Sequence, residues 1–189
     1  MARQAVTPHG LRTRAALLDA ARSLAGERGL AGLSVSAITA RAGVAKGTFY
    51  VHFADRDALV EALRTDFRAR ATEAIDRATA GLEPGARRLV AGLVGYLDAS
   101  LHDSAIKALL REARRELGPA GPDDAARAFA AAIAPNLRAM GWREPAEGAR
   151  LVVALVGEVS VIELEAGAKV PAARRAMRRL VERADLSRG

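Results

Sequence analysis

Four residues with hydrogen-bonding side chains follow one another closely near the amino end of the chain: Lys46, Thr48, Tyr50 and His52. An ammonium group can donate to guanine O6 and N7, and a threonine can use its hydroxyl or touch a thymine methyl. The tyrosine hydroxyl can reach a phosphate. On an ideal helix Gly47, Thr48, Val51 and His52 share one side, and such a face of small and polar residues can press closely against a grooved partner.

The residues around this group predict the elements that hold it. Ser34 is a natural N-cap for a short helix that runs to Ala42, Gly43 ends that helix, and a second one runs from Lys46 to Phe53. The apolar residues of this stretch are spaced to pack together and onto the preceding helix: Ile38, Ala42, Val44, Phe49 and Phe53. Residues 34–53 therefore indicate a helix-turn-helix, whose second helix enters the DNA major groove with its N-terminus first. The alternative is an ordinary helical hairpin that carries one lysine.

Charge is concentrated in the same part of the chain. The formal net charge is +7, and residues 1–56 hold eight Lys or Arg against three acids, so that they carry +5 and the remaining residues +2. This distribution is typical of a protein that touches a polyanion at one end. The competing interpretation is a composition rich in arginine throughout.

The stretch Gly43–Val60, G-V-A-K-G-T-F-Y-V-H-F-A-D-R-D-A-L-V, closely resembles the signature of the TetR family of bacterial transcriptional regulators, and the resemblance spans residues 13–63. It implies an all-α protein of about nine helices, three of them for DNA and the rest for effector binding and dimerisation. It places the DNA contacts on these residues: Ser36, Lys46, Gly47, Thr48, Tyr50, His52 and Arg56. Two positions depart from the family pattern. Ala45 stands where many relatives have a capping serine, and Val51 stands where relatives often have an aromatic residue.

The expected domains are residues 1–55, with the helix-turn-helix at about 34–53, and residues 56–189, which begin with a long helix capped by Asp55. Further helices are expected at residues 84–101, 104–117, 122–140, 145–167 and 171–186. Pro135 should kink or split its helix. The Val-rich run 151–162 reads as a strand or a helix by periodicity, and the length of the pattern favours the helix.

The last two helices are expected to form a homodimer interface. Glu158 lies on the stripe of Leu151, Leu155 and Ile162, so we expect it to be buried and paired with an arginine, or else to sense a ligand. An effector pocket is predicted to involve Phe67, Tyr96, Phe129, Ile133, Trp142 and Glu158. Ordinary core packing is the alternative for the aromatic residues.

The sequence also excludes several classes of protein. It has no cysteine, three scattered histidines, and no metal-binding, phosphate-loop or nucleophile-elbow motif, so we expect no enzyme activity, catalytic residue, metal or cofactor. Its apolar runs fall far short of the roughly 18 residues of a membrane span, and the N-terminus lacks a signal-peptide core. A cytoplasmic protein, associated with the nucleoid when bound to DNA, is expected.

Together these features predict a ligand-responsive, sequence-specific DNA-binding regulator. We expect a repressor that a small-molecule effector releases from a palindromic operator. The alternative is a non-specific architectural DNA-binding protein or helical scaffold.

Overall fold

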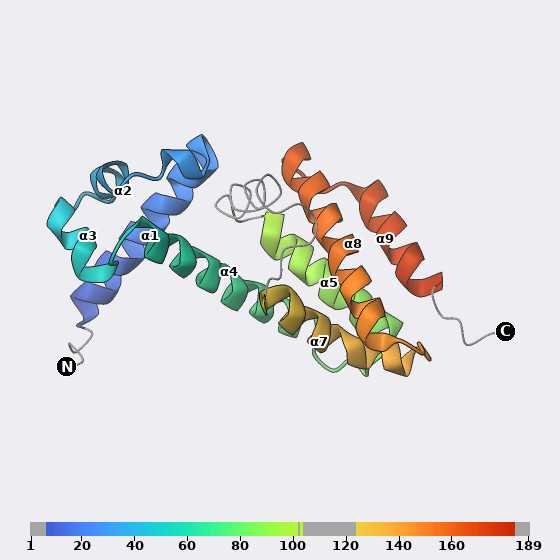
Figure 1. Ribbon diagram of the computed structural model, residues 1–189. Coiled ribbons are helices and arrows are strands. Elements are labelled where there is room, and N and C mark those ends of the chain that lie inside the picture. Colours follow the sequence, from blue (N-terminus) through green and yellow to red (C-terminus); the bar gives the residue numbers. More distant parts are fainter. Residues whose placement is uncertain (1–6, 102, 104–123, 184–189) are drawn as a thin grey trace. The chain divides into compact units, whose positions relative to one another are not determined.

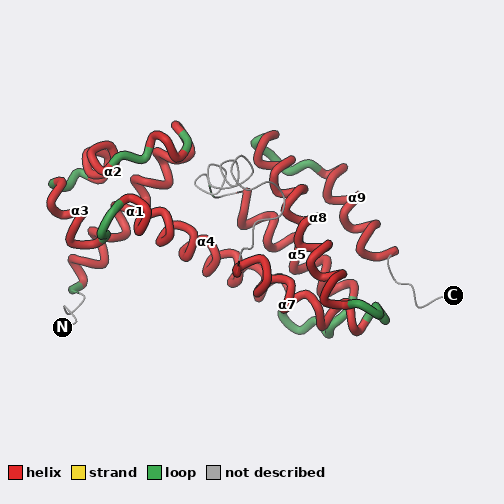
Figure 2. The backbone as a smooth tube through the Cα atoms, viewed as in Figure 1, coloured by secondary structure: helices red, strands yellow, loops and turns green. Residues whose placement is uncertain are grey.

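The computed structural model describes residues 7–101, 103 and 124–183 of the chain, and these residues form eight α-helices, one 3-10 turn and no strand (Figures 1 and 2). The predicted all-α fold is confirmed. The described residues divide into two compact units, one with residues 7–68 and Asp103 and the other with residues 69–101 and 124–183. Within the described part of the chain, no helix combines the length and the apolar character needed to span a bilayer.

The first unit opens with α1, Pro8–Arg28, whose two ends carry clear sequence signals. Thr7 caps the helix, because its hydroxyl oxygen accepts a hydrogen bond from the backbone N–H of Gly10 at 3.1 Å. Gly29 ends it at a φ of 68°, a conformation that favours glycine. A 3-10 turn, η1 at Leu30–Gly32, then leads to the next helix. The sequence predicted the end of α1 at Gly29 but not this turn.

Two short helices and a long one follow: α2 at Val35–Ala42, α3 at Lys46–His52 and α4 at Arg56–Thr79. Ser34 caps α2 by accepting from the N–H of Ala37 at 3.1 Å, and Gly43 ends it in the left-handed region. Asp55 caps α4 by accepting from the N–H of Ala58 at 2.7 Å. These caps confirm the predicted boundaries to within one residue.

The second unit contains the end of α4 and four further helices: α5 at Ala86–Leu101, α7 at Asp124–Ala139, α8 at Pro145–Ala166 and α9 at Pro171–Arg183. The helix α8 packs against α5, α7 and α9, and the Val-rich run within it is helical, as expected (Figure 1). The helix α7 continues through Pro135, so this proline does not split it. The predicted helix 104–117 lies outside the described residues.

Apolar side chains from all four of these helices form one core, with Leu97, Leu137 and Ala149 fully buried in it. Gly95 lets α5 approach the end of α4 closely, because a Cβ at this position would lie 2.9 Å from the carbonyl oxygen of Ala74. Burial of this apolar surface is the main stabilising contribution to the second unit.

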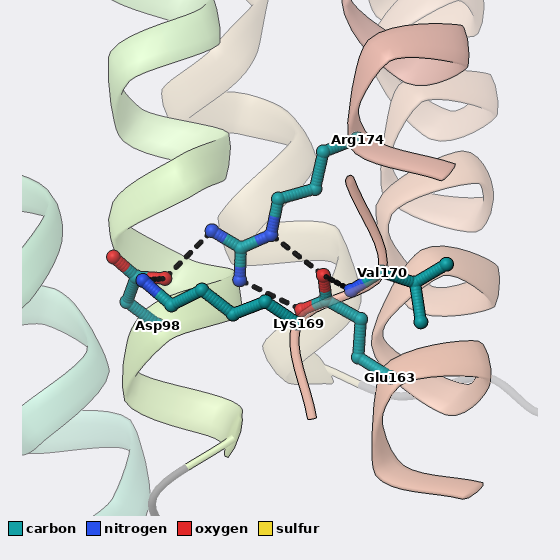
Figure 3. Close-up of polar contacts among 5 residues, drawn as sticks. All are labelled: Asp98, Glu163, Lys169, Val170 and Arg174. Atoms are coloured by element: carbon teal, nitrogen blue, oxygen red, sulfur yellow. Dashed lines mark hydrogen bonds and ion pairs between the residues drawn. The ribbon is translucent and has the colours of Figure 1, made fainter. Parts of the chain in front are cut away.

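A partly buried ionic cluster ties α5, α8 and α9 together (Figure 3). The carboxylate of Glu163, 1% exposed, accepts from Nε and Nη2 of Arg174 at 2.6 and 2.7 Å and from the backbone N–H of Val170 at 2.8 Å. Arg174 also donates to Asp98 at 2.6 Å, and Lys169 lies 2.9 Å from the same carboxylate oxygen. Burial raises the pKa of Asp98, but the hydrogen bonds from Lys169 and Arg174 outweigh this effect and bring the pKa below its usual value.

The prediction that Glu158 is buried is wrong for the single chain, in which this residue is exposed. The stripe to which it was assigned also faces outward, with Leu151 69% and Ile162 37% exposed. The buried glutamate that pairs with an arginine is Glu163, which lies on the opposite, packed side of α8. The reason is that α8 carries apolar residues on both faces, so that its pattern does not tell which face packs inward.

Candidate nucleic-acid interface

The start of α3 is held by backbone geometry rather than by a side chain. Ala45 occupies the N-cap position and makes no side-chain cap, and the N–H of Thr48 bonds back to the carbonyl oxygen of Ala45 at 2.9 Å. Ala45, which departs from the family pattern, thus leaves α3 without a side-chain cap. A serine at an N-cap contributes about 1 kcal/mol, so α3 relies on packing for its order.

That packing comes from the inner face of α3. Phe49 is completely buried and Phe53 is 4% exposed, and their ring centroids lie 5.6 Å apart. Ile38 of α2 and Leu59 of α4 are also completely buried. The guanidinium carbon of Arg14 lies 5.2 Å from the centroid of the Phe53 ring, a cation–π contact between α1 and the end of α3. The predicted division of α3 into an apolar inner face and a polar outer face is present.

The outer face of α3 is open where the helix begins and along its middle. Val51 is 68% exposed and Tyr50 54% exposed, and Lys46 and Gly47 are also exposed. A Cβ built at Gly47 would meet no atom within 4 Å. Glycine also weakens a helix relative to alanine. The fold itself thus gives no reason for a glycine at this position.

The other predicted contact residues lie around this face. Thr48 and His52 are half-buried, and Ser36 is exposed on α2. His52 lies near the start of α1, where a Cβ at Gly10 would come within 3.8 Å of its Cε1.

Several basic residues of this unit are engaged in pairs within it. Arg22 pairs with Asp66 and so joins α1 to α4, and Arg41 binds both carboxylate oxygens of Glu27 at 2.8 and 2.9 Å and so joins α1 to α2. The hydrogen bonds from Arg41, together with one from the Ser23 hydroxyl, lower the pKa of Glu27 to about 2. By contrast, Lys46 forms no ion pair among the described residues. The number of basic residues in the sequence therefore overstates the number of cationic groups that this unit offers to a partner.

Arg56 makes contacts within the unit that the sequence did not predict. Its guanidinium donates to the backbone carbonyl oxygens of Leu33 at 3.0 Å and Leu30 at 2.8 Å, and it contacts Asp57 at 3.3 Å. The family resemblance implies a DNA contact at this position. All three of its guanidinium nitrogens make contacts inside the unit, two of them to backbone carbonyl oxygens, and the sequence pattern did not reveal this.

The predicted pocket residues are mostly packed together in the core. Tyr96 and Phe129 are in ring contact at 5.4 Å between centroids, and both, like Trp142, pack against the core cluster that contains Ile133. Phe67 is buried in the first unit. The second unit also has an open groove of about 580 Å³, and none of the predicted pocket residues lines it; its residues are Ala78, Ala86, Arg87, Val90, Ala91, Val94, Arg178 and Glu182.

Residues 17–63, which include α2 and α3, match the family model described as bacterial regulatory proteins, tetR family. The helix-turn-helix region of the chain is therefore of the TetR-family type. TetR-family proteins are DNA-binding transcriptional regulators rather than enzymes. No curated protein matches the chain in sequence.

Solved structures show the same fold over nearly the whole chain. A TetR-family transcriptional regulator from Pectobacterium atrosepticum is 25% identical, with a TM-score of 0.70 over 96% of this chain and 95% of that one. A TetR-family regulator from a Rhodococcus species is 24% identical, with a TM-score of 0.75 over 92% and 99% of the two chains. RolR, solved in complex with resorcinol, is 20% identical, with a TM-score of 0.60 over 92% and 87%. The fold is thus that of TetR-family regulators over both units.

Proposed function

We propose that this protein is a sequence-specific repressor of transcription that reads operator DNA with α3 and leaves it when a small-molecule effector binds. The observation that carries the proposal is the outer face of α3. On this face there is open space at Gly47, and Val51 is 68% exposed. Lys46 pairs with no acid among the described residues. Such a face fits a major groove when the helix enters with its N-terminus first.

The proposed contacts divide into two kinds. Lys46 donates to guanine O6 and N7, and Thr48 contacts a neighbouring base, while Gly47 lets the backbone come close. Tyr50 and His52, at the far end of α3, and Ser36 on α2 reach the phosphates. Base contacts select the sequence and phosphate contacts fix the position of the helix on it.

We propose that α8 and α9 form the interface of a homodimer. Three large apolar side chains of these helices are exposed on the single chain, namely Leu151 at 69%, Leu180 at 61% and Ile162 at 37%. Burying them against a second copy removes apolar surface from water. A dimer places two recognition helices about 34–36 Å apart, in successive major grooves of a palindromic site.

We assign DNA binding to residues 1–55 and effector binding with dimerisation to residues 56–189. The ligand is a small molecule that binds among the predicted pocket residues that lie in the core of the second unit, namely Tyr96, Phe129, Ile133 and Trp142. RolR, which shares the fold, was solved with resorcinol bound, and this supports a small-molecule effector here. An effector can bind more tightly to a dimer whose recognition helices have a different spacing than to the dimer that fits DNA. The ratio of these two effector affinities sets how far the effector lowers operator affinity. The protein acts in the cytoplasm, on the nucleoid.

A gel-shift titration tests this function. The protein is titrated against the DNA upstream of its own gene in the presence of an excess of unrelated duplex. The target band should persist at competitor concentrations that abolish non-specific binding, and Thr48→Ala should relax the base preference at one or two positions per half-site. If unrelated DNA competes as well as the target, the protein is an architectural DNA-binding protein and sequence-specific regulation is refuted.

A further inference from the structure

The side chain of Arg56 folds back from the start of α4 onto the corner between α1 and α2. Its Nε donates to the carbonyl oxygen of Leu33 at 3.0 Å and its Nη2 to that of Leu30 at 2.8 Å. Leu30 is the first residue of the 3-10 turn η1, and Leu33 directly follows the turn. Arg56 therefore bridges this turn from the outside, with both hydrogen bonds part-buried.

These carbonyl groups lie directly before the helix-turn-helix. Leu33 is 1% exposed and directly precedes Ser34, which caps α2. From there α2 leads through the Gly43 turn to α3, whose Phe49 is completely buried, as is Leu59 of α4. The guanidinium fixes the entry of α2 relative to the first turn of α4, and α3 lies between these two elements in the chain.

We infer that Arg56 is a positioning residue for the recognition helix and not a phosphate contact. It holds α2 and α3 in the single orientation that meets DNA, through its hydrogen bonds to the backbone and not through its charge. This inference rests on the proposed DNA-binding function. It assigns the residue a role different from the one that the family resemblance implies.

The two roles predict opposite rankings of three variants. In Arg56→Gln the side-chain Nε2 occupies the place of the arginine Nε and can keep the bond to Leu33, although the charge is lost. In Arg56→Lys the charge remains, but a single ammonium group at the end of a flexible chain does not reproduce the fork that spans both carbonyls. Arg56→Ala loses both features.

The experiment measures operator affinity for the full-length wild type and the three variants at several salt concentrations. We expect Arg56→Ala to bind about tenfold more weakly, the effect of losing two net hydrogen bonds, while its plot of log K against log salt keeps the wild-type slope. Arg56→Gln, which keeps one of the two bonds, should bind roughly threefold more tightly than Arg56→Ala, and Arg56→Lys should recover little. Arg64→Gln, which removes one exposed charge two turns further along α4, is the matched control and should bind within about twofold of wild type.

Three results overturn the inference. The first is a salt slope that falls by roughly 1 in Arg56→Ala together with rescue by lysine, which identifies a phosphate contact. The second is wild-type affinity in Arg56→Ala. The third is a loss of operator affinity in each variant that matches its unfolded fraction, measured by circular dichroism. Arg56 would then contribute only to the stability of the fold. If Arg56→Ala does not fold, the comparison of Arg56→Gln with Arg56→Lys decides. A wild-type protein without sequence preference refutes the proposed function itself, a result separate from any ranking of the variants.

Discussion

Gly47 is a position at which the stability of the fold and the proposed DNA binding should favour different residues. It is the second residue of α3, its φ is not positive, and a Cβ at this position would contact nothing within 4 Å. Alanine is better than glycine by about 0.8–1.0 kcal/mol in a helix interior and by less in the first turn. We therefore expect Gly47→Ala to raise the free energy of unfolding by about 0.5 kcal/mol, which corresponds to roughly 1–2 °C in Tm for a chain of this size.

The same substitution should weaken operator binding. The added methyl projects into the space that the bases are proposed to occupy, and a tightly packed contact that receives an extra carbon typically loses about 1–3 kcal/mol. We expect a loss of about tenfold in affinity, measured by fluorescence anisotropy with labelled operator, while Tm rises in the same preparation.

A second glycine provides the control. Gly157 of α8 is likewise helical, a Cβ placed on it would have no atom within 4 Å, and it lies in the other unit. Because α8 also belongs to the proposed dimer interface, the oligomeric state of Gly157→Ala is first compared with that of wild type by sedimentation. With an unchanged oligomeric state, this variant should give a comparable or larger gain in Tm and leave operator affinity unchanged. If Gly47→Ala binds operator as tightly as wild type, the reasoning that places this face of α3 close to the bases is wrong.

Three further predictions concern the stability of the fold. Ala45→Ser should supply the missing N-cap of α3 and raise the free energy of unfolding by about 1 kcal/mol in chemical denaturation; no gain would show that another group already satisfies these N–H donors. Glu163→Gln should lower the free energy of unfolding by about 2–4 kcal/mol, because it leaves the guanidinium of Arg174 without its buried bidentate partner. Adding Arg174→Met should restore part of this loss, and strictly additive losses would contradict a coupled pair. Glu27, whose folded-state pKa of about 2 lies below its ordinary value of 4.5, should stabilise the protein above pH 4.5, and this contribution should be lost as the pH falls towards 2. Glu27→Gln should flatten the stability profile over this interval, whereas superimposable profiles would rule out the contribution.

The helix-turn-helix could be predicted from sequence because its signals are local. Ser34, Gly43 and Asp55 act on backbone groups within a few residues of themselves, and each is found at the helix end that it predicts. The spacing of Phe49 and Phe53 likewise fixes the inner face of α3. The same rules placed α5, α8 and α9 to within two residues at their starts.

Features that depend on the packing of distant residues were not predictable in this way. Sequence alone does not tell that Arg56 turns back to carbonyl groups more than twenty residues earlier, or that Arg41 is neutralised by Glu27. The positions of Glu158 and Glu163 illustrate the same difficulty. They lie five residues apart on a helix that is apolar on both faces, and only the packing of α8 against α5 and α9 decides which of them is buried.

The central claim is that the exposed face of α3 reads a particular DNA sequence. The most direct measurement is selection of bound duplexes from a random-sequence library by the full-length protein, with the double variant Lys46→Ala, Thr48→Ala carried through in parallel. We expect the wild type to enrich one inverted repeat with half-sites about one helical turn apart, and the variant to enrich none or a less restricted one. Enrichment of no common sequence by the wild type, or of the same sequence by both proteins, would contradict the claim.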